Sequence, residues 1–240
     1  MSGDVGKAAA KVAAYDWEKI GAELDAFGAA ILPKLLTESE CHNFATKWHD
    51  SAAFRTTISM ARHGFGRGEY KYYANPLPAL IGSLRASLYP QLAPVANAWS
   101  RRMGGDTRYP PSHDAFLERC HAAGQLRPTP LLLQYGEGDY NCLHQDLYGD
   151  IAFPLQVAIL LSKPGEDFSG GEFVLTEQRP RMQSRAEVVP LEQGDAVIFA
   201  VNDRPVQGTR GDYRVKMRHG VSRIRSGMRH TLGIIFHDAR

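Results

Sequence analysis

The sequence predicts a mainly β protein with N-terminal helices and a double-stranded β-helix, the jelly-roll barrel of cupin-like proteins, as its core. Three observations predict this class. Roughly the first hundred residues carry apolar side chains at helical spacing. From about residue 130 the pattern changes to short β-type runs separated by Gly, Pro and Asp. About eight such runs occur, and eight short strands with long connections are typical of a jelly roll.

We expect a single domain over residues 1–240, with the helices packed on one face of the barrel. Residues 1–125 would form a helical support, and residues 130–238 would form the barrel core. The segment from about residue 61 to 78 differs from both, because it is rich in Gly, Tyr and basic residues and ends near two prolines. We expect it to be an irregular or hairpin-like excursion.

The helical support is predicted to contain three main helices. Residues 8–32 carry apolar residues at helical spacing and predict the first. Thr37 with Glu40 three residues later is a capping-box pattern that opens the second. The third is expected over about 79–102, interrupted at its two internal prolines.

The expected strands of the core are short and are separated by turn residues. They lie at 129–135, 142–147, 153–162, 170–177, 186–191, 195–200, 213–224 and 229–237.

Composition excludes several classes of protein. The chain has 240 residues, 43% hydrophobic and 22% charged, which is ordinary for a globular protein. No apolar run reaches membrane-spanning length and no signal peptide is evident, so we expect a cytoplasmic protein without a membrane partner. The three cysteines have no paired spacing, which indicates reduced thiols and excludes a Cys-x-x-Cys zinc site. Composition does not indicate an oligomeric state.

Charge is balanced overall but uneven locally. The net charge is +2, so no global field indicates a nucleic-acid partner. Between Arg204 and Arg229 there are eight basic residues and one acidic residue, Asp212. A solvated basic face explains this run, and so does a polyanionic substrate.

The stretch LHQDLYGD, residues 143–150, places His144 and Asp146 two residues apart. On a strand such residues point the same way, so both would face the barrel interior while Gln145 faces out. Alone, a His-x-Asp triplet is most often a pair of surface residues. His219, in VKMRHGVSRI, adds a second histidine from a distant strand. Two histidines and one carboxylate form the facial triad of non-haem Fe(II) oxygenases, which leaves coordination positions open.

Arg229 lies in the apolar stretch RHTLGIIFH. A buried arginine is costly unless it meets an anion, and the guanidinium fork suits a carboxylate in two-point contact. Thr231 lies two residues further on the same face, where its hydroxyl can join that contact.

His144-x-Asp146, His219 and Arg229 ten residues later resemble the 2-oxoglutarate/Fe(II)-dependent dioxygenase superfamily, over roughly residues 130–237. The resemblance implies an oxygenase that uses Fe(II), 2-oxoglutarate and O2. It implies iron at His144, Asp146 and His219, which would form the catalytic centre, and the distal carboxylate of 2-oxoglutarate at Arg229. Relatives often place residues that touch 2-oxoglutarate at the distance where Gln134 and Tyr135 precede the triplet. Alternate faces of an ordinary strand explain this pair equally well.

Strand alternation raises a question of register between His219 and Arg229. If Ser226-Gly227 formed a two-residue turn, Ile224 would lie opposite Arg229, and His219 would then face the wrong side. One odd residue is required. Either the loop is Arg225 to Gly227 with Gly227 left-handed, or a bulge interrupts Ser222-Arg223. We favour the bulge, which turns Val221 and Ile224 inward and Arg223 outward.

Three further stretches, SGGEFVLTEQRPRMQSR, GDAVIFA and HGVSRIRSGMRHTLGIIFHDA, resemble a bacterial group of these oxygenases linked to oxidative demethylation of nucleic acid, a function like that of AlkB-type repair enzymes. The AlkB proteins carry a second arginine shortly after the 2-oxoglutarate arginine. Here the tail has His237 instead, so AlkB substrate residues are not transferred.

The segment at 61–78 would then be a flexible substrate lid over an alkylated, single-stranded nucleic acid. Aromatic side chains stack on bases and cations follow phosphates, and a damaged base must leave the stack to reach iron. The expected lid residues are Arg67, Tyr70, Lys71, Tyr72 and Tyr73. A structural hairpin whose tyrosines cover the barrel is the alternative. For the whole protein, the alternatives are a hydroxylase of a protein side chain or small metabolite, and a metal-free binding barrel.

Overall fold

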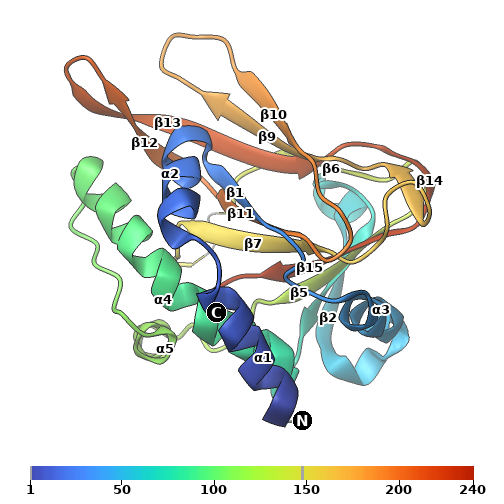
Figure 1. Ribbon diagram of the computed structural model, residues 1–240. Helices are drawn as coiled ribbons and strands as arrows, with labels where there is room; N and C mark the ends of the chain where they lie inside the picture. The colour runs from blue at the N-terminus through green and yellow to red at the C-terminus, as the bar shows by residue number, and fades with distance from the viewer. Residues whose placement is uncertain (1, 147–148) are drawn as a thin grey trace.

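Two antiparallel sheets face each other in the computed structural model, which describes residues 2–146 and 149–240 (Figure 1). The larger sheet has seven strands in the order β1-β11-β7-β15-β5-β4-β2. The smaller has six, and its path β10-β9-β13-β6-β3 is joined by β12, which pairs with β13. The sheets are not closed into a continuous barrel. The predicted fold class, a mainly β jelly roll with N-terminal helices, is confirmed.

All eight expected strands are present, with shorter bounds. They are β5 Leu131–Tyr135, β6 Tyr140–His144, β7 Leu155–Leu160, β9 Phe173–Gln178, β10 Arg185–Val189, β11 Ala196–Ala200, β13 Gly211–Val221 and β15 Arg229–Ile234. Seven further strands of the described chain were not expected from the sequence. They are β1 Ala29–Leu32, β2 Phe54–Ser59, β3 Gly66–Arg67, β4 Glu69–Tyr73, β8 Phe168–Gly170, β12 Asp203–Gly208 and β14 Ile224–Gly227.

The helices pack against the face of the seven-stranded sheet that is turned away from the smaller sheet (Figure 1). They are α1 Ser2–Ala13, α2 Trp17–Phe27, α3 Glu38–Thr46, α4 Ala79–Arg102 and α5 His113–Ala122, with 3-10 turns at Lys47–His49, Ser51–Ala53 and Met60–His63. The main core lies in this layer, where Leu84, Leu88 and Leu92 of α4 meet the strands. No helix of the described chain is long and apolar enough to span a bilayer.

Two helix predictions are wrong in detail. The helix expected over 8–32 is divided, because Asp16 caps α2 and Gly28 ends it with a left-handed φ of 77°. Residues 29–32 instead pair with β11, since four apolar residues at a sheet edge are better satisfied as a strand. The internal prolines do not interrupt α4, which runs continuously from Ala79 to Arg102. The capping box of Thr37 and Glu40 is confirmed, with both hydrogen bonds formed.

β13 ends just before Ser222-Arg223, where the bulge is expected, but a two-residue turn at Ser226-Gly227 does not form. β13 ends at Val221, and Val221 and Ile224 are buried while Arg223 is exposed. The expected pairing of Ile224 with Arg229 is wrong, because β14 pairs with β8. Gly227, at the end of β14, is left-handed with a φ of 79°.

A buried arginine, Arg204 of β12, joins the end of α2 to the smaller sheet. The guanidinium of Arg204 is 1% exposed and donates to the carboxylate of Glu177, which is 3% exposed. Arg204 also donates to the carbonyl oxygen of Asp25 at 2.6 Å, near the end of α2. Arg179, a more exposed residue, contacts the same carboxylate from the other side at 2.6 Å. Removing one member of a buried pair leaves the other without its charge partner.

We therefore expect Arg204→Met to lower the free energy of unfolding by about 3 kcal/mol, because Glu177 loses its buried partner. Arg179→Met is the matched control and should cost under about 1 kcal/mol, as exposed ion pairs do. Urea unfolding followed by circular dichroism measures both. Equal losses for the two variants would show that burial does not distinguish these arginines.

Candidate active site

Three side chains converge between the two sheets at the end of β6. His219 of β13 lies directly across from His144 of β6. The Asp146 carboxylate lies between them, with Oδ1 3.4 Å from His144 Nε2 and Oδ2 3.5 Å from His219 Nε2. One ligand atom from each residue lies within 4.8 Å of the others, so this group can hold a metal ion.

The strand expected at 142–147 ends earlier, at His144. Asp146 therefore reaches the site from the loop that follows. The expectation that Gln145 faces out is wrong, because alternation stops where the strand stops. Its amide donates to Asn202 Oδ1 at 2.6 Å and to the Met217 carbonyl at 2.9 Å. Leu147 lies outside the described residues.

Burial and hydrogen bonds determine the protonation of the three groups. Burial lowers the pKa of His144, but the hydrogen bond and the charge of Asp146 outweigh it and raise the pKa above its usual value. His144 Nδ1 lies 2.7 Å from the Cys142 carbonyl, which fixes its proton there and leaves Nε2 facing Asp146. Burial lowers the pKa of His219. Burial also opposes ionisation of Asp146, but hydrogen bonds from His144 and His219 outweigh it and lower the pKa of the carboxyl. A carboxylate and two imidazole nitrogens are the donors expected at a non-haem Fe(II) centre.

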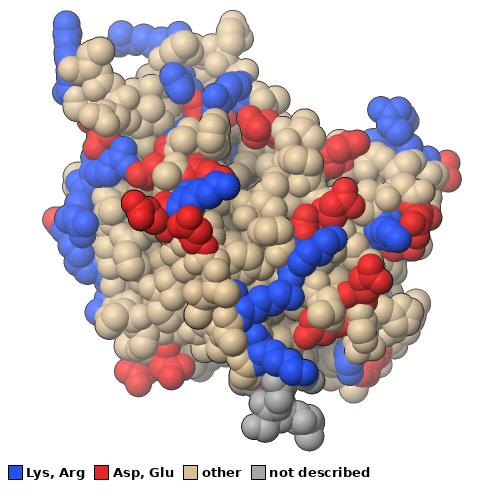
Figure 2. All heavy atoms as spheres, viewed as in Figure 1, with Lys and Arg blue, Asp and Glu red and all other residues tan. Residues whose placement is uncertain are grey.

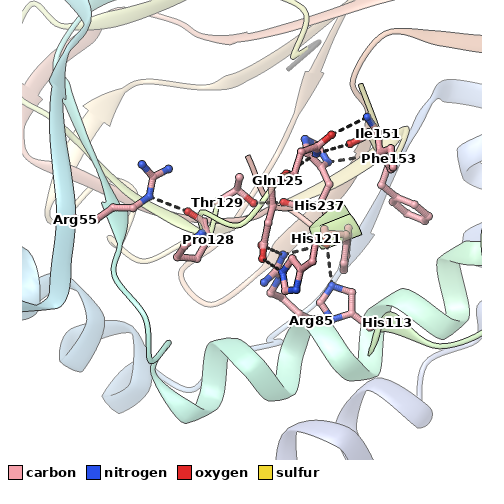
Figure 3. A network of polar contacts seen from close by, with 12 residues as sticks. Arg55, Arg85, His113, His121, Gln125, Pro128, Thr129, Ile151, Phe153 and His237 are labelled. Atoms are coloured by element: carbon pink, nitrogen blue, oxygen red, sulfur yellow. Dashed lines mark hydrogen bonds and ion pairs between the residues drawn. The ribbon is translucent and has the colours of Figure 1, made fainter. Parts of the chain in front are cut away.

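Packing and hydrogen bonds hold this centre in place. The ring of Phe199 lies 4.5 Å from that of His219. On the other side, Gln125 clamps the loop after Asp146, donating to the Ile151 carbonyl and accepting from its N–H, both at 2.9 Å (Figure 3). His237 accepts from the Phe153 N–H in the same network, and burial lowers its pKa to about 4, so the ring stays neutral.

Arg229 is a buried cation without a carboxylate partner among the described residues. It is 2% exposed, and burial lowers its pKa to about 10. Its Nη1 donates to Thr231 Oγ1 at 2.6 Å, and its guanidinium lies 5.7 Å from the centre of the Tyr135 ring. The other two buried arginines are paired, Arg85 with Asp238 at 2.9 Å and Arg204 with Glu177. A buried guanidinium with no carboxylate partner among these residues is suited to bind an anion.

One cavity of about 220 Å³ joins Arg229 to the three converging residues. Alternate residues of β15 and the segment after it, from Arg229 through Thr231 to Ile235, line one wall. The cavity therefore contains the Arg229 cation and the three possible metal ligands, together with the amides of Asn141, Gln145 and Gln156.

Of the two residues expected near the cosubstrate, Tyr135 lines the cavity and Gln134 does not. Tyr135 is fully buried, lines the cavity and covers Arg229. Gln134 faces the other side of β5, where its amide nitrogen lies 2.8 Å from His230 Nε2. For Gln134, the structure therefore favours the alternative interpretation, in which this residue lies on the other face of an ordinary strand. His230 points away from the Arg229 face.

The expected lid residues from Tyr70 to Tyr73 lie on two faces of a paired strand, because the segment is not a free loop. β4 pairs with β5 on one side and β2 on the other. Tyr70 and Tyr72 line the cavity, whereas Lys71 and Tyr73 occupy the opposite face. Tyr73 is fully buried, and Lys71 Nζ donates to the Trp48 carbonyl at 2.7 Å. These placements remove Lys71 and Tyr73 from the expected substrate surface.

Arg67 remains at the surface, with a side chain 61% exposed and 3.7 Å from Asp139. Phe65, an aromatic residue of the same segment, lines the cavity while 39% exposed and stacks on His63 at 5.3 Å. The alternation of aromatic and basic residues that predicts the lid also includes Phe65.

The basic run does not form one face. Arg204 and Arg229 are buried, Lys216 lies 3.4 Å from Asp203, and Arg214 donates to the Met103 carbonyl at 2.6 Å. On the face in Figure 2, Lys and Arg gather along the left edge, near the β12–β13 hairpin, and elsewhere they alternate with Asp and Glu. Charge on this face therefore does not by itself identify a polyanion site.

Solved structures share the fold at low sequence identity. A Pseudomonas putida prolyl-4-hydroxylase is 14% identical, with a TM-score of 0.54 over 93% of this chain and 99% of that one. A prolyl hydroxylase of Trichoplax adhaerens, in complex with a peptide fragment, is 15% identical, with a TM-score of 0.55 over 91% and 87%. A Burkholderia pseudomallei oxidoreductase of the 2OG-Fe(II) oxygenase family is 14% identical, with a TM-score of 0.53 over 94% and 93%.

Sequence relatives are closer. Two uncharacterized proteins of Mycobacterium tuberculosis, from strains CDC 1551 / Oshkosh and ATCC 25618 / H37Rv, are each 52% identical over 164 residues, which cover 68% of this chain and 70% of theirs. The model of the Oxygenase-NA family, described as "Oxygenase, catalysing oxidative methylation of damaged DNA", matches residues 68–239. The match spans the triad, Arg229 and every strand from β4 onward, and the chain therefore belongs to the Oxygenase-NA family of oxygenases.

Proposed function

We propose that this oxygenase uses Fe(II), 2-oxoglutarate and O2 to demethylate alkylated bases in single-stranded nucleic acid. The family and the fold imply these cofactors. The main evidence for 2-oxoglutarate as cosubstrate is a cavity. It links two histidines and one carboxylate to Arg229, a buried guanidinium without a carboxylate partner among the described residues. The cytoplasmic location and the single domain stay predictions.

Each end of the cavity has its own task. His144, Asp146 and His219 would hold Fe(II) from one side and leave positions open toward the cavity. Arg229 and Thr231 would bind the distal carboxylate of 2-oxoglutarate, in a site dry enough to strengthen that contact. Iron held there would supply the oxidation, in which O2 would give one oxygen atom to a methyl group and one to succinate as 2-oxoglutarate loses CO2. The hydroxymethyl group then leaves as formaldehyde.

The substrate assignment is supported by the family description, which refers to damaged DNA, and by the residues at the cavity mouth. Phe65, Tyr70 and Tyr72 line the cavity, and an extruded base needs aromatic faces of this kind. Arg67 lies exposed near them. A hydroxylase of a protein side chain or a small metabolite would use the same iron and cosubstrate residues. Substrate-dependent formation of succinate separates these functions from each other and from a non-catalytic binding barrel.

The decisive measurement is succinate formation by the Fe(II)-loaded protein with methylated single-stranded DNA, compared with unmethylated DNA, a proline-containing peptide and free amino acids. We expect methylated DNA to stimulate turnover most and to release formaldehyde. Stimulation by the peptide or amino acids alone would favour the hydroxylase instead. Absence of 2-oxoglutarate turnover under every condition would favour the binding barrel.

His219→Ala should abolish 2-oxoglutarate turnover and Fe(II) binding while circular dichroism remains that of the folded protein. The reason is that two remaining donors cannot complete the facial set. His49→Ala is the matched control, because His49 is exposed and lies outside the cavity. Undiminished turnover by His219→Ala would exclude this residue as an iron ligand.

Arg229→Ala should weaken 2-oxoglutarate binding by about 2–3 kcal/mol, the usual worth of a hydrogen bond to a charged group. Calorimetric titration of the metal-loaded protein measures it. Arg223→Ala and Arg225→Ala serve as controls, since both side chains are exposed. A larger effect at Arg225 than at Arg229 would place the cosubstrate elsewhere.

At the cavity mouth, loss of an aromatic ring and loss of a charge should affect oligonucleotide binding in different ways. Tyr70→Ala or Tyr72→Ala should weaken binding of a methylated single-stranded oligonucleotide by roughly 1–3 kcal/mol at every salt concentration, for whichever ring stacks on a base. Arg67→Ala should instead reduce the salt dependence, because phosphate contacts release counterions. Lys71→Ala is the control and should leave the salt dependence of binding unchanged. Fluorescence anisotropy across a salt series tests this, and binding that does not respond to salt in the wild type would contradict the nucleic-acid assignment.

A further inference from the structure

Gln156 is a polar residue in the interior of an otherwise apolar strand. It lies in β7, whose sequence is LQVAIL, and it is 5% exposed. Its side-chain nitrogen is fully buried and has no hydrogen-bond partner among the described residues. Strand alternation places Gln156, Ala158 and Leu160 on the same face, toward the smaller sheet.

The register fixes the level of Gln156 in the cavity. Gln156 lies opposite Phe199 on β11, and the Phe199 ring packs 4.5 Å from the ring of His219. Thr231 lies opposite Leu160, four residues away along β7, which corresponds to roughly 13 Å. Gln156 therefore belongs to the metal-ligand end of the cavity, away from Thr231 and its partner Arg229.

A second buried glutamine shows how this protein normally treats such a side chain. Gln125 is fully buried, and its amide makes three hydrogen bonds, two with Ile151 and one with the Asp238 carbonyl (Figure 3). Burying an amide without a partner is unfavourable, whereas replacing it with an apolar group of the same shape is neutral or stabilising. Gln156 therefore reduces the stability of the folded protein unless a ligand accepts its hydrogen bond.

We propose that Gln156 is a specificity-determining residue that donates a hydrogen bond to an oxygen acceptor bound beside His219 and Asp146. The proposal rests on the proposed function, which supplies two carriers of such an oxygen. One is the end of 2-oxoglutarate that is remote from Arg229, and the other is a carbonyl group of the substrate. The donor selects for ligands that place an oxygen at this level of the cavity, since any other ligand leaves the amide unpaired.

Two variants of similar shape test the proposal. Gln156→Met removes the donor and keeps the length, and Gln156→Glu replaces the donor by an acceptor. Gln125→Met is the matched control. Thermal unfolding should show Gln156→Met at or above the melting temperature of the wild type and Gln125→Met well below it. If Gln156→Met loses as much stability as Gln125→Met, the Gln156 amide is a structural group and the proposal is wrong.

Binding identifies the acceptor. With Mn(II) in place of iron, 2-oxoglutarate should bind about tenfold more weakly to Gln156→Met, and more weakly still to Gln156→Glu, if the cosubstrate carries the oxygen. If the substrate carries it, 2-oxoglutarate binding stays at the wild-type value. The methylated oligonucleotide then binds about tenfold more weakly, and more 2-oxoglutarate is consumed per formaldehyde released. Wild-type affinity for both ligands in Gln156→Met would overturn the proposal. Failure of the wild type to bind 2-oxoglutarate would instead overturn the proposed function, and the unfolding comparison would still report on Gln156.

Discussion

The pairing of β6 with β13 is the constraint on which the site depends. It sets His144 directly across from His219, although a long stretch of chain separates them. Cross-strand neighbours have Cβ atoms about 5 Å apart, so two imidazoles placed in this way can meet one ion. The loop after β6 then needs to return only one carboxylate, that of Asp146. A slip of one residue in this register would turn one histidine out of the cavity.

The three buried arginines of the described chain differ in their partners. Arg85 and Arg204 each meet a carboxylate, and both join separate parts of the chain. Arg229 donates to the Thr231 hydroxyl and lies over aromatic rings, and no carboxylate among the described residues pairs with it. Burial is the same in all three cases, so the missing acid is the informative difference. The same comparison applies to Gln125 and Gln156, where one amide is satisfied within the fold and the other is not.

Much of the core was predictable from sequence, because the β runs alternate with clear turn residues and the triplet, His219 and Arg229 stand out in apolar surroundings. The N-terminal strands were not predictable in this way. β1 and β4 are short, and they become strands only because β11 and β5 offer open edges. The alternation of side chains along a strand also cannot show where the strand ends. For this reason alternation predicts that Gln145 faces outward, although β6 ends before it. Partners of side chains, such as Trp48 for Lys71, arise from tertiary contact alone.

The placement of β4 has a consequence for how the protein meets its substrate. Because this strand is hydrogen-bonded on both edges, Tyr70 and Tyr72 are held in a rigid frame before any ligand arrives. A rim of this kind does not fold over its ligand, so little ordering entropy is lost at the rim on association. If these tyrosines receive the substrate, selection would act on the ligand's own conformations and favour molecules whose reactive group is already displayed. Such a receptor discriminates by the population of a minor form of its ligand, and its apparent affinity scales with that population.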